Sequence, residues 1–188
     1  MKSPFKIIFI HGWTASSNAD WYPNISKELI KLKVDFAIPD LPGELTPHAD
    51  EWLEVINNEV IKSSKPSILV GHSLGSRAVL LYLEKYRKKI EKIFLIAAFA
   101  NRLENAKRRN ENYKDFFEHI IDVKIIKPLV GKFYVLHSRD DSSIPYSQGE
   151  EIAKDLNAQL ITYEDRDHFS EPENAKFVLE ILRRELNV

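Results

Sequence analysis

Cysteine is absent from the 188 residues of this chain. Its absence excludes disulfide bonds, thiolate metal sites and cysteine nucleophiles at once. A chain without cysteine also suits a reducing compartment, where disulfides do not persist. The apolar run at 6–10 is too short for the core of a secretory signal, and no small-residue cleavage site follows it. We therefore expect a cytoplasmic protein.

An excess of charge of one sign and long apolar runs are also missing. The chain has 27 Lys and Arg residues against 28 Asp and Glu residues, for a formal net charge of -1. This balance exerts no overall attraction on nucleic acid or acidic membranes. The basic cluster Lys107-Arg108-Arg109 is flanked by Glu104 and Glu111, which is typical of a solvated helical face. Since no apolar stretch is long enough to cross a bilayer, we expect neither a nucleic-acid partner nor a membrane span.

Strand-like and helix-like patterns alternate along the chain. Short β-branched and aromatic runs predict strands at 6–10, 34–38, 67–71, 92–97, 133–137 and 159–163. Periodic apolar patterns predict helices at 21–32, 49–62, 74–86, 146–156 and 174–186. Repeated strand–helix units form a parallel sheet with helices on both faces. We predict one compact α/β domain over residues 1–188, with a parallel sheet of about six strands.

One segment interrupts this alternation, at 102–128. It is charged at first and then apolar, and it is long for a connection between strands. In a fold of this kind such an excursion can be a small lid or a pocket wall. Irregular packing without a functional part is an equally good interpretation.

Between the third predicted strand and its helix stands Gly71-His72-Ser73-Leu74-Gly75, which matches the pattern G-x-S-x-G. In this context the pattern indicates a nucleophile elbow, a sharp turn that exposes the serine Oγ above the sheet. Side chains two residues before and after the serine would crowd the turn, and glycine has none. The amino end of the next helix then points to where negative charge develops in acyl transfer. The alternative is a tight turn whose serine caps the helix.

A nucleophilic serine needs a histidine as base and an acid that orients the histidine. In α/β-hydrolases the acid and then the histidine follow the serine along the chain. The acid is Asp141 or Asp140 after the fifth predicted strand, and the Ile144-Pro145 pair beyond them favours Asp141. His168 is the candidate base, because it alone of the six histidines is both late in the chain and in a loop. Each of these residues, taken alone, could also have a purely structural role: an aspartate as a helix cap or a solvated side chain, and the histidine as a packed ring.

Two backbone N–H groups are expected to stabilise the oxyanion. One is that of Leu74, directly after the serine. The other lies in the loop after the first strand, where we choose Trp13 and keep Gly12 as the alternative. Aromatic residues that suit either an apolar acyl pocket or the hydrophobic core are Trp13, Phe116, Phe117 and Phe169.

With these residues in place, the whole chain resembles the small serine hydrolases of the retinoblastoma-binding protein 9 type. The matching pieces are Gly71-His72-Ser73-Leu74-Gly75, Asp140-Asp141 with Ile144-Pro145, and Asp167-His168-Phe169. The resemblance implies a compact α/β-hydrolase fold without the first two strands of larger relatives, and esterase or peptidase-like activity. The first loop, His11-Gly12-Trp13, is like that of general esterases and departs from the glycine-rich form of this family. The retinoblastoma-binding motif requires a cysteine, so the resemblance does not extend that partner to this chain.

We therefore predict a serine hydrolase that cleaves a carboxylic ester, thioester or small amide of a small acyl substrate, through an acyl-enzyme on Ser73. The reaction needs no cofactor, and no histidine and carboxylate spacing indicates a metal site. Two alternatives remain open. One is a binding or regulatory protein on a hydrolase scaffold with little catalytic activity. The other is a haloperoxidase- or lyase-like reaction on the same three residues.

Overall fold

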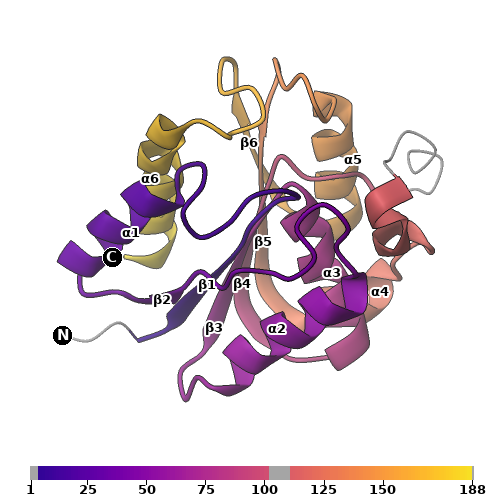
Figure 1. Cartoon of the computed structure of the whole chain (residues 1–188), viewed down its shortest axis with the longest axis horizontal. Coiled ribbons are helices and arrows are strands. Elements are labelled where there is room, and N and C mark those ends of the chain that lie inside the picture. The colour runs from indigo at the N-terminus through magenta and orange to yellow at the C-terminus, as the bar shows by residue number, and fades with distance from the viewer. Residues whose placement is uncertain (1–3, 102–110, 188) are drawn as a thin grey trace.

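A single sheet of six parallel strands organises the protein, whose computed structural model describes residues 4–101 and 111–187. The strand order is β2-β1-β3-β4-β5-β6 (Figure 1). In chain order the strands are β1 (Lys6–Ile10), β2 (Asp35–Ala37), β3 (Ser67–His72), β4 (Ile90–Ile96), β5 (Val130–Ser138) and β6 (Gln159–Tyr163). The predicted α/β architecture with a six-stranded parallel sheet is therefore confirmed.

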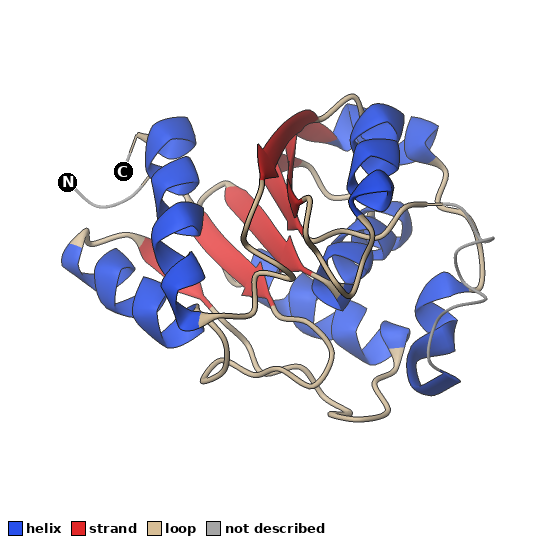
Figure 2. Cartoon of the chain, turned by 90° about the horizontal axis from the view of Figure 1, so that it is seen from above, coloured by secondary structure: helices blue, strands red, loops and turns tan. Residues whose placement is uncertain are grey.

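Helices cover both faces of this sheet, as predicted (Figures 1 and 2). On one face lie α1 (Tyr22–Lys31) and α6 (Ala175–Leu186). On the other lie α2 (Ala49–Ile61), α3 (Leu74–Tyr86) and α5 (Tyr146–Leu156), with the short α4 (Val123–Ile126) against α3. None of the helices in the described ranges is long and apolar enough to span a bilayer.

The strands are apolar on both sides because each side of the sheet belongs to a different core. In β1, Ile8 and Ile10 belong to the core on the side of α2 and α3, whereas Ile7 and Phe9 belong to the core on the side of α1 and α6. All four side chains are fully buried. Near-continuous apolar runs of this kind are typical of parallel strands that helices cover from both sides.

The predicted strand that differs most from the observed one is the fifth. β5 begins at Val130, three residues before the predicted start at Phe133. Gly131 and Lys132 have low β propensity, which hid this part of the strand in the sequence. In the structure Val130 pairs with Ile90 of β4, so the neighbouring strand extends β5 through backbone hydrogen bonding.

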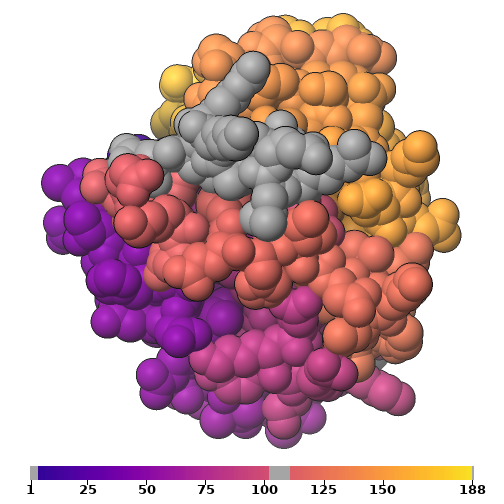
Figure 3. Space-filling view, turned by 90° about the vertical axis from the view of Figure 1, so that its right-hand side faces the viewer, coloured from indigo at the N-terminus to yellow at the C-terminus, as the bar shows by residue number. Residues whose placement is uncertain are grey.

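The interrupting segment lies partly outside the described residues, which omit 102–110. Its described part forms η2 (Glu111–Phe117), α4 and η3 (Lys127–Leu129). These residues, in salmon, occupy the middle of one face of the molecule, beside the orange C-terminal part (Figure 3).

Arg77 of α3 anchors this segment from beneath and is only 2% exposed. Its guanidinium donates to the backbone carbonyls of Phe116 at 2.8 Å and His119 at 2.7 Å, and to the side-chain oxygen of Asn101 at 2.9 Å. Asn101 in turn exchanges two hydrogen bonds with the backbone of Ile121. The segment is therefore held to the same helix that carries the candidate serine at its start.

Candidate active site

Ser73 occupies the turn between β3 and α3. Its φ of 52° and ψ of -121° lie outside the regions that L-residues ordinarily adopt. A hydrogen bond from its N–H to the Ile96 carbonyl of β4, at 2.9 Å, ties this turn to the sheet. Strain of this kind persists only where the surrounding structure enforces it. The turn places Ser73 beyond the carboxyl ends of the strands, where active sites of parallel sheets form.

The glycines around Ser73 are explained by close backbone packing. A Cβ on Gly75 would lie 2.2 Å from the carbonyl oxygen of Ile10, and one on Gly71 would lie 2.7 Å from the carbonyl oxygen of Gly75. The first turn of α3 therefore packs directly on the end of β1. This packing also brings the loop after β1 to the serine, because a Cβ on Gly12 would lie 3.2 Å from Ser73 Cβ.

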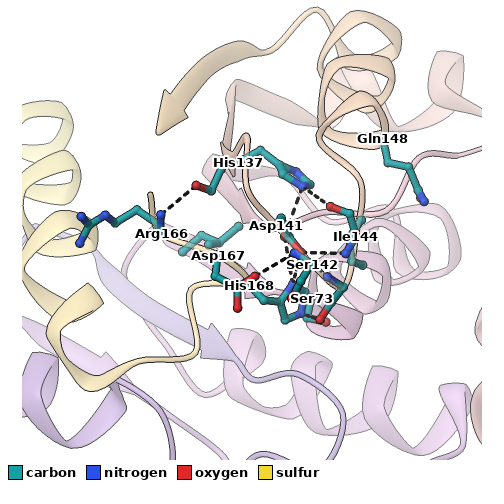
Figure 4. Close-up of polar contacts among 12 residues, drawn as sticks. Ser73, His137, Asp141, Ser142, Ile144, Gln148, Arg166, Asp167 and His168 are labelled. Carbon is teal, nitrogen blue, oxygen red and sulfur yellow. Dashed lines mark hydrogen bonds and ion pairs between the residues drawn. The ribbon is translucent and has the colours of Figure 1, made fainter. Parts of the chain in front are cut away.

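The His168 ring lies between Ser73 and Asp141 (Figure 4). Ser73 Oγ donates a hydrogen bond to His168 Nε2 at 2.9 Å. On the other side of the ring, Nδ1 donates to Asp141, at 3.0 Å from Oδ2 and 3.2 Å from Oδ1. The structure thus brings together the three residues that the sequence proposed for the nucleophile, the base and the acid. This geometry allows the ring to take the hydroxyl proton while the carboxylate stabilises the resulting imidazolium.

Residues on both sides of His168 hold its loop in place. Asp167 and Phe169 both have left-handed backbone angles, with φ of 42° and 57°. The Phe169 ring is fully buried in the core under α1 and α6, edge-on to Tyr163 of β6. Phe169 is therefore an anchor for the loop and does not line a pocket, which corrects the expectation from the sequence.

Asp141 is the carboxylate in contact with His168, and its side chain is completely shielded from solvent. Its Oδ1 accepts hydrogen bonds from the backbone N–H groups of Ser143 at 2.9 Å and Ile144 at 2.7 Å. The Nε2–H of His137 lies 2.9 Å from the Ile144 carbonyl and 3.4 Å from Asp141 Oδ2, so the carboxylate is its second acceptor.

These donors determine the charge of Asp141. Burial by itself raises the pKa of this carboxyl, but hydrogen bonds from His137 and His168, the charge of His168 and a hydrogen bond from the Ile144 N–H together outweigh burial. The pKa of Asp141 is consequently held well below its ordinary range. The carboxylate is ionised at neutral pH and can hold the proton of His168 on Nδ1.

Asp140, the alternative acid in the sequence, is exposed and has other partners. Its Oδ1 accepts hydrogen bonds from the Ser138 hydroxyl at 2.5 Å and from the Asp167 N–H at 2.9 Å. Asp140 therefore supports the loop that carries His168, while the ring itself contacts Asp141.

The loop after β1 forms the other side of the site. The buried ring of His11 shapes this loop by donating from Nδ1 to the Gly12 carbonyl at 2.8 Å. Gly12, Trp13 and Leu74 all border the same cavity as Ser73. Leu74 is the first residue of α3, so its N–H has no acceptor within the helix. The helix start and this loop are thus both positioned to present N–H groups beside the serine.

A cavity of about 620 Å³ opens over Ser73 and His168. Its aromatic walls are Trp13, Phe99 and Tyr113. The rings of Trp13 and Tyr113 meet edge-to-face with centroids 5.0 Å apart. Of the four aromatic residues considered in the sequence, Trp13 borders the cavity.

The other two predicted pocket aromatics do not border this cavity. Phe116 and Phe117 are 0% and 5% exposed and pack in the core with α2 and α3. Tyr113 from the same segment borders the cavity in their place. Because Tyr113 lies at a kink in η2, with φ of -137°, the helical spacing of the segment gave no indication of this.

His72 and His137 are two buried rings whose contacts the sequence did not reveal. The Nε2–H of His72 donates to the backbone carbonyl of His168 at 2.7 Å. Burial lowers the pKa of His72 to about 3, so this ring is neutral at physiological pH. Their positions beside the serine and inside a strand were readable, but the sequence did not show that His72 reaches the carbonyl of His168, 96 residues away, or that His137 turns to the carbonyl of Ile144 in the loop after β5. No set of three or more His, Cys, Asp or Glu residues within 4–101 and 111–187 could hold a metal ion.

Comparison with known proteins identifies the family of this chain. The profile of the serine hydrolase family matches residues 7–176. The chain belongs to the serine hydrolase family. Within it, the chain is 31% identical over 170 residues to YdeN of Bacillus subtilis (strain 168), covering 89% of this chain and 87% of YdeN. It is also 26% identical over 176 residues to serine hydrolase RBBP9 of Rattus norvegicus, covering 92% of this chain and 91% of that protein.

Solved structures place this serine hydrolase among α/β-hydrolases. The crystal structure of the ydeN gene product from B. subtilis superposes with a TM-score of 0.84 at 27% identity, over 100% of both chains. Alpha/beta hydrolase domain-containing protein 10 from mouse gives a TM-score of 0.79 at 17% identity, covering 97% of this chain and 89% of that chain, a likeness of fold. The predicted resemblance to the retinoblastoma-binding protein 9 type is confirmed, and the family supports hydrolase activity for the chain.

Proposed function

We propose that this protein cleaves carboxylic esters, thioesters or small amides through an acyl-enzyme on Ser73. The observation that carries the proposal is the His168 ring, which lies 2.9 Å from Ser73 Oγ and 3.0 Å from Asp141 Oδ2. The cavity of about 620 Å³ above these atoms is within the usual size range of small-molecule sites. Its mixed aromatic and polar walls suit a small acyl substrate.

In the first half of the reaction, Ser73 Oγ attacks the carbonyl carbon of the substrate while its proton moves to His168 Nε2. Asp141 keeps the other ring proton on Nδ1 and stabilises the imidazolium. When the bond to the leaving group breaks, His168 gives its proton to the leaving oxygen, sulfur or nitrogen. The acyl group then remains on Ser73 as an ester.

The negative charge on the tetrahedral intermediate is stabilised by backbone N–H groups. We assign these to Leu74 at the start of α3 and to Trp13 in the loop after β1, with Gly12 as the alternative in that loop. Support for this assignment comes from the cavity, which all three residues border next to Ser73. The positive end of the α3 dipole adds to the stabilisation.

In the second half, His168 takes a proton from a water molecule that attacks the acyl carbon. The bond to Ser73 Oγ breaks, and His168 returns the proton to Oγ. The products are the free acid and the original enzyme. Every step uses the side chains of Ser73, His168 and Asp141, and no metal or cofactor takes part.

Ser73→Ala tests the proposal. Removal of the nucleophile from such an arrangement lowers kcat by about 10⁶-fold, so we expect hydrolysis of p-nitrophenyl acetate to fall to background. The melting temperature should stay near that of the wild type, because alanine leaves the packing around the turn intact. Retained turnover in a folded Ser73→Ala protein would falsify the assignment of the nucleophile.

Fluorophosphonate labelling separates this enzyme from a binding protein on a hydrolase scaffold. An activated serine reacts covalently with the probe, whereas an ordinary serine does not. We expect stoichiometric labelling of the wild type and none of Ser73→Ala. An unlabelled wild type would favour the binding protein.

A further inference from the structure

Asp20 is the one residue bordering the active-site cavity, among the described residues, whose side chain is a carboxylate. The border contains no lysine or arginine from the described part of the chain, and its other polar side chains are hydroxyls, one amide and the rings of His72 and His168. The Asp20 side chain is 20% exposed, so it is partly shielded from solvent. A carboxylate in such a place gives this wall of the cavity a negative potential.

His72 adds to the negative character of this wall. Its Nε2 carries the proton that is donated to the His168 carbonyl, so in the neutral ring Nδ1 bears a lone pair. Nδ1 is buried and has no hydrogen-bond partner among residues 4–101 and 111–187, and it lies 3.8 Å from Asp20 Oδ2. Two acceptors therefore face one another without a donor between them, an arrangement that a nearby cation stabilises.

The charges around Asp20 also leave its carboxylate without a strong positive partner among the described residues. Burial raises the pKa of Asp20, the charge of Glu171 raises it further, and a positive His168 lowers it. Among residues 4–101 and 111–187, no lysine or arginine borders the cavity, so within this part of the chain the ionised carboxylate has no fixed cation there of the kind that normally accompanies a shielded acidic group. A positively charged group of a bound substrate would supply that partner.

The backbone at Asp20 does not by itself call for a carboxylate. Its φ is 49°, in the left-handed region, which glycine and asparagine adopt at least as readily as aspartate. Asparagine would preserve both the shape of the side chain and this conformation. The charge is therefore the property that distinguishes Asp20 at this position.

We propose that Asp20 binds a cationic group of the substrate, so that the enzyme prefers esters or amides with an ammonium group close to the scissile carbonyl. This inference rests on the proposed hydrolysis at Ser73. Asp20 acts here as a specificity residue, because it contacts a part of the substrate that does not react. The ammonium can belong to the acyl part or to the alcohol part, and two pairs of substrates distinguish these sources.

The test compares charged esters with neutral esters of nearly the same shape. For the acyl part, the pair is the p-nitrophenyl ester of leucine and that of isocaproic acid, which lacks only the amino group. For the alcohol part, the pair is acetylcholine and neohexyl acetate. We expect the wild type to prefer the charged member of at least one pair by about tenfold or more in kcat/KM, the effect of one charge-assisted contact.

Asp20→Asn should lower this ratio by about tenfold while leaving hydrolysis of the neutral ester within about twofold of the wild type. Glu171→Gln is the matched control, because it removes an equal charge from an exposed residue that does not border the cavity. It should keep the ratio within about threefold, as expected for a screened charge. Equal melting temperatures verify that both variants are folded.

The outcomes separate this inference from the proposed function. A wild type that hydrolyses neutral esters in a Ser73-dependent way, yet prefers neither charged ester, overturns the role of Asp20 alone. Equal losses on charged and neutral esters in a folded Asp20→Asn protein also overturn it. Absence of any Ser73-dependent ester hydrolysis overturns the proposed function and this inference together.

Discussion

Two regions of this protein each place a histidine against a carboxylate beside a cavity. In the inner region His168 lies 3.0 Å from Asp141, under a cavity of about 620 Å³. In the outer region His119 lies 2.6 Å from Glu84, beside a cavity of about 510 Å³ formed largely by α2, α3 and the segment at 111–119. The outer pair is the shorter of the two, so the distance alone does not identify a site.

The two regions differ in the exposure of the pair and in whether a hydroxyl group lies beside the histidine. The Asp141 side chain is 0% exposed against 19% for Glu84, and the His168 side chain is 16% exposed against 56% for His119. An ion pair as exposed as the outer one contributes little. His168 also meets a serine hydroxyl on its far side, and no serine or threonine is among the described residues that border the outer cavity. A histidine–carboxylate pair becomes a candidate catalytic site when the carboxylate is buried and a nucleophile contacts the other side of the histidine ring.

The largest expected difference is between His168→Gln and His119→Gln. Loss of the base should lower kcat for p-nitrophenyl acetate by roughly 10⁵- to 10⁶-fold, because the serine is no longer deprotonated. His119→Gln should leave kcat within about twofold, since its ring is solvated and remote from Ser73. Steady-state kinetics on both purified variants provide the measurement. Similar losses in the two would contradict the distinction between the regions.

Next in size is the difference between the adjacent carboxylates in the inner region. Asp141→Asn should lower kcat by about 10⁴-fold, because an amide does not hold the histidine in its required tautomer. Asp140→Asn should cost at most about tenfold, since Asp140 acts only through the backbone of the His168 loop. Both are measured as kcat with the same ester, and circular dichroism verifies the fold. A reversed order would assign the acid to Asp140.

The smallest expected effect concerns stability in acid. In the folded protein the His72 ring stays neutral down to its pKa of about 3, whereas in the unfolded chain it takes up a proton near ~6.5. The unfolded state therefore binds more protons below that pH, and stability falls as the pH decreases from ~6.5, by up to about 1.4 kcal/mol per pH unit. His72→Gln keeps a donor for the His168 carbonyl and removes this titration.

Urea unfolding at a series of pH values between neutral and acid conditions measures this effect. The free energy of unfolding of His72→Gln should decline less steeply with falling pH than that of the wild type. The remaining decline below pH ~4 is expected from Asp141, whose lowered pKa stabilises the fold only while the carboxylate is ionised. Identical slopes in the two proteins would mean that His72 does not titrate on unfolding.

Much of the fold was predictable because its signals are local. The strand and helix boundaries followed from apolar runs and periodicity, and Gly71 and Gly75 marked a turn that tolerates no Cβ at either position. The choice of Asp141 over Asp140 rested on a motif, and the contacts agree with it because only Asp141 faces the histidine. The start of β5 was missed, since pairing with β4 outweighs the low β propensity of Gly131 and Lys132.

The cavity walls were the least predictable part of the site. Phe116, Phe117 and Phe169 are as apolar as Tyr113, and composition does not tell a core ring from a pocket ring. Phe116 and Phe117 lie in the core because Arg77 holds the backbone carbonyl of Phe116 against α3. Asp20 likewise gave no signal in the sequence, because its importance depends on the loop that carries it to the cavity.

By itself, the sequence determined the alternation of strands and helices, the strained serine turn and the chain order of serine, acid and histidine. These features depend on neighbouring residues, whose steric and hydrogen-bonding demands act over short distances. Only the tertiary structure decided which carboxylate meets His168, which rings border the cavity and which charge stands within it. Those outcomes depend on the direction of each side chain, and that direction is set by packing between segments far apart along the chain.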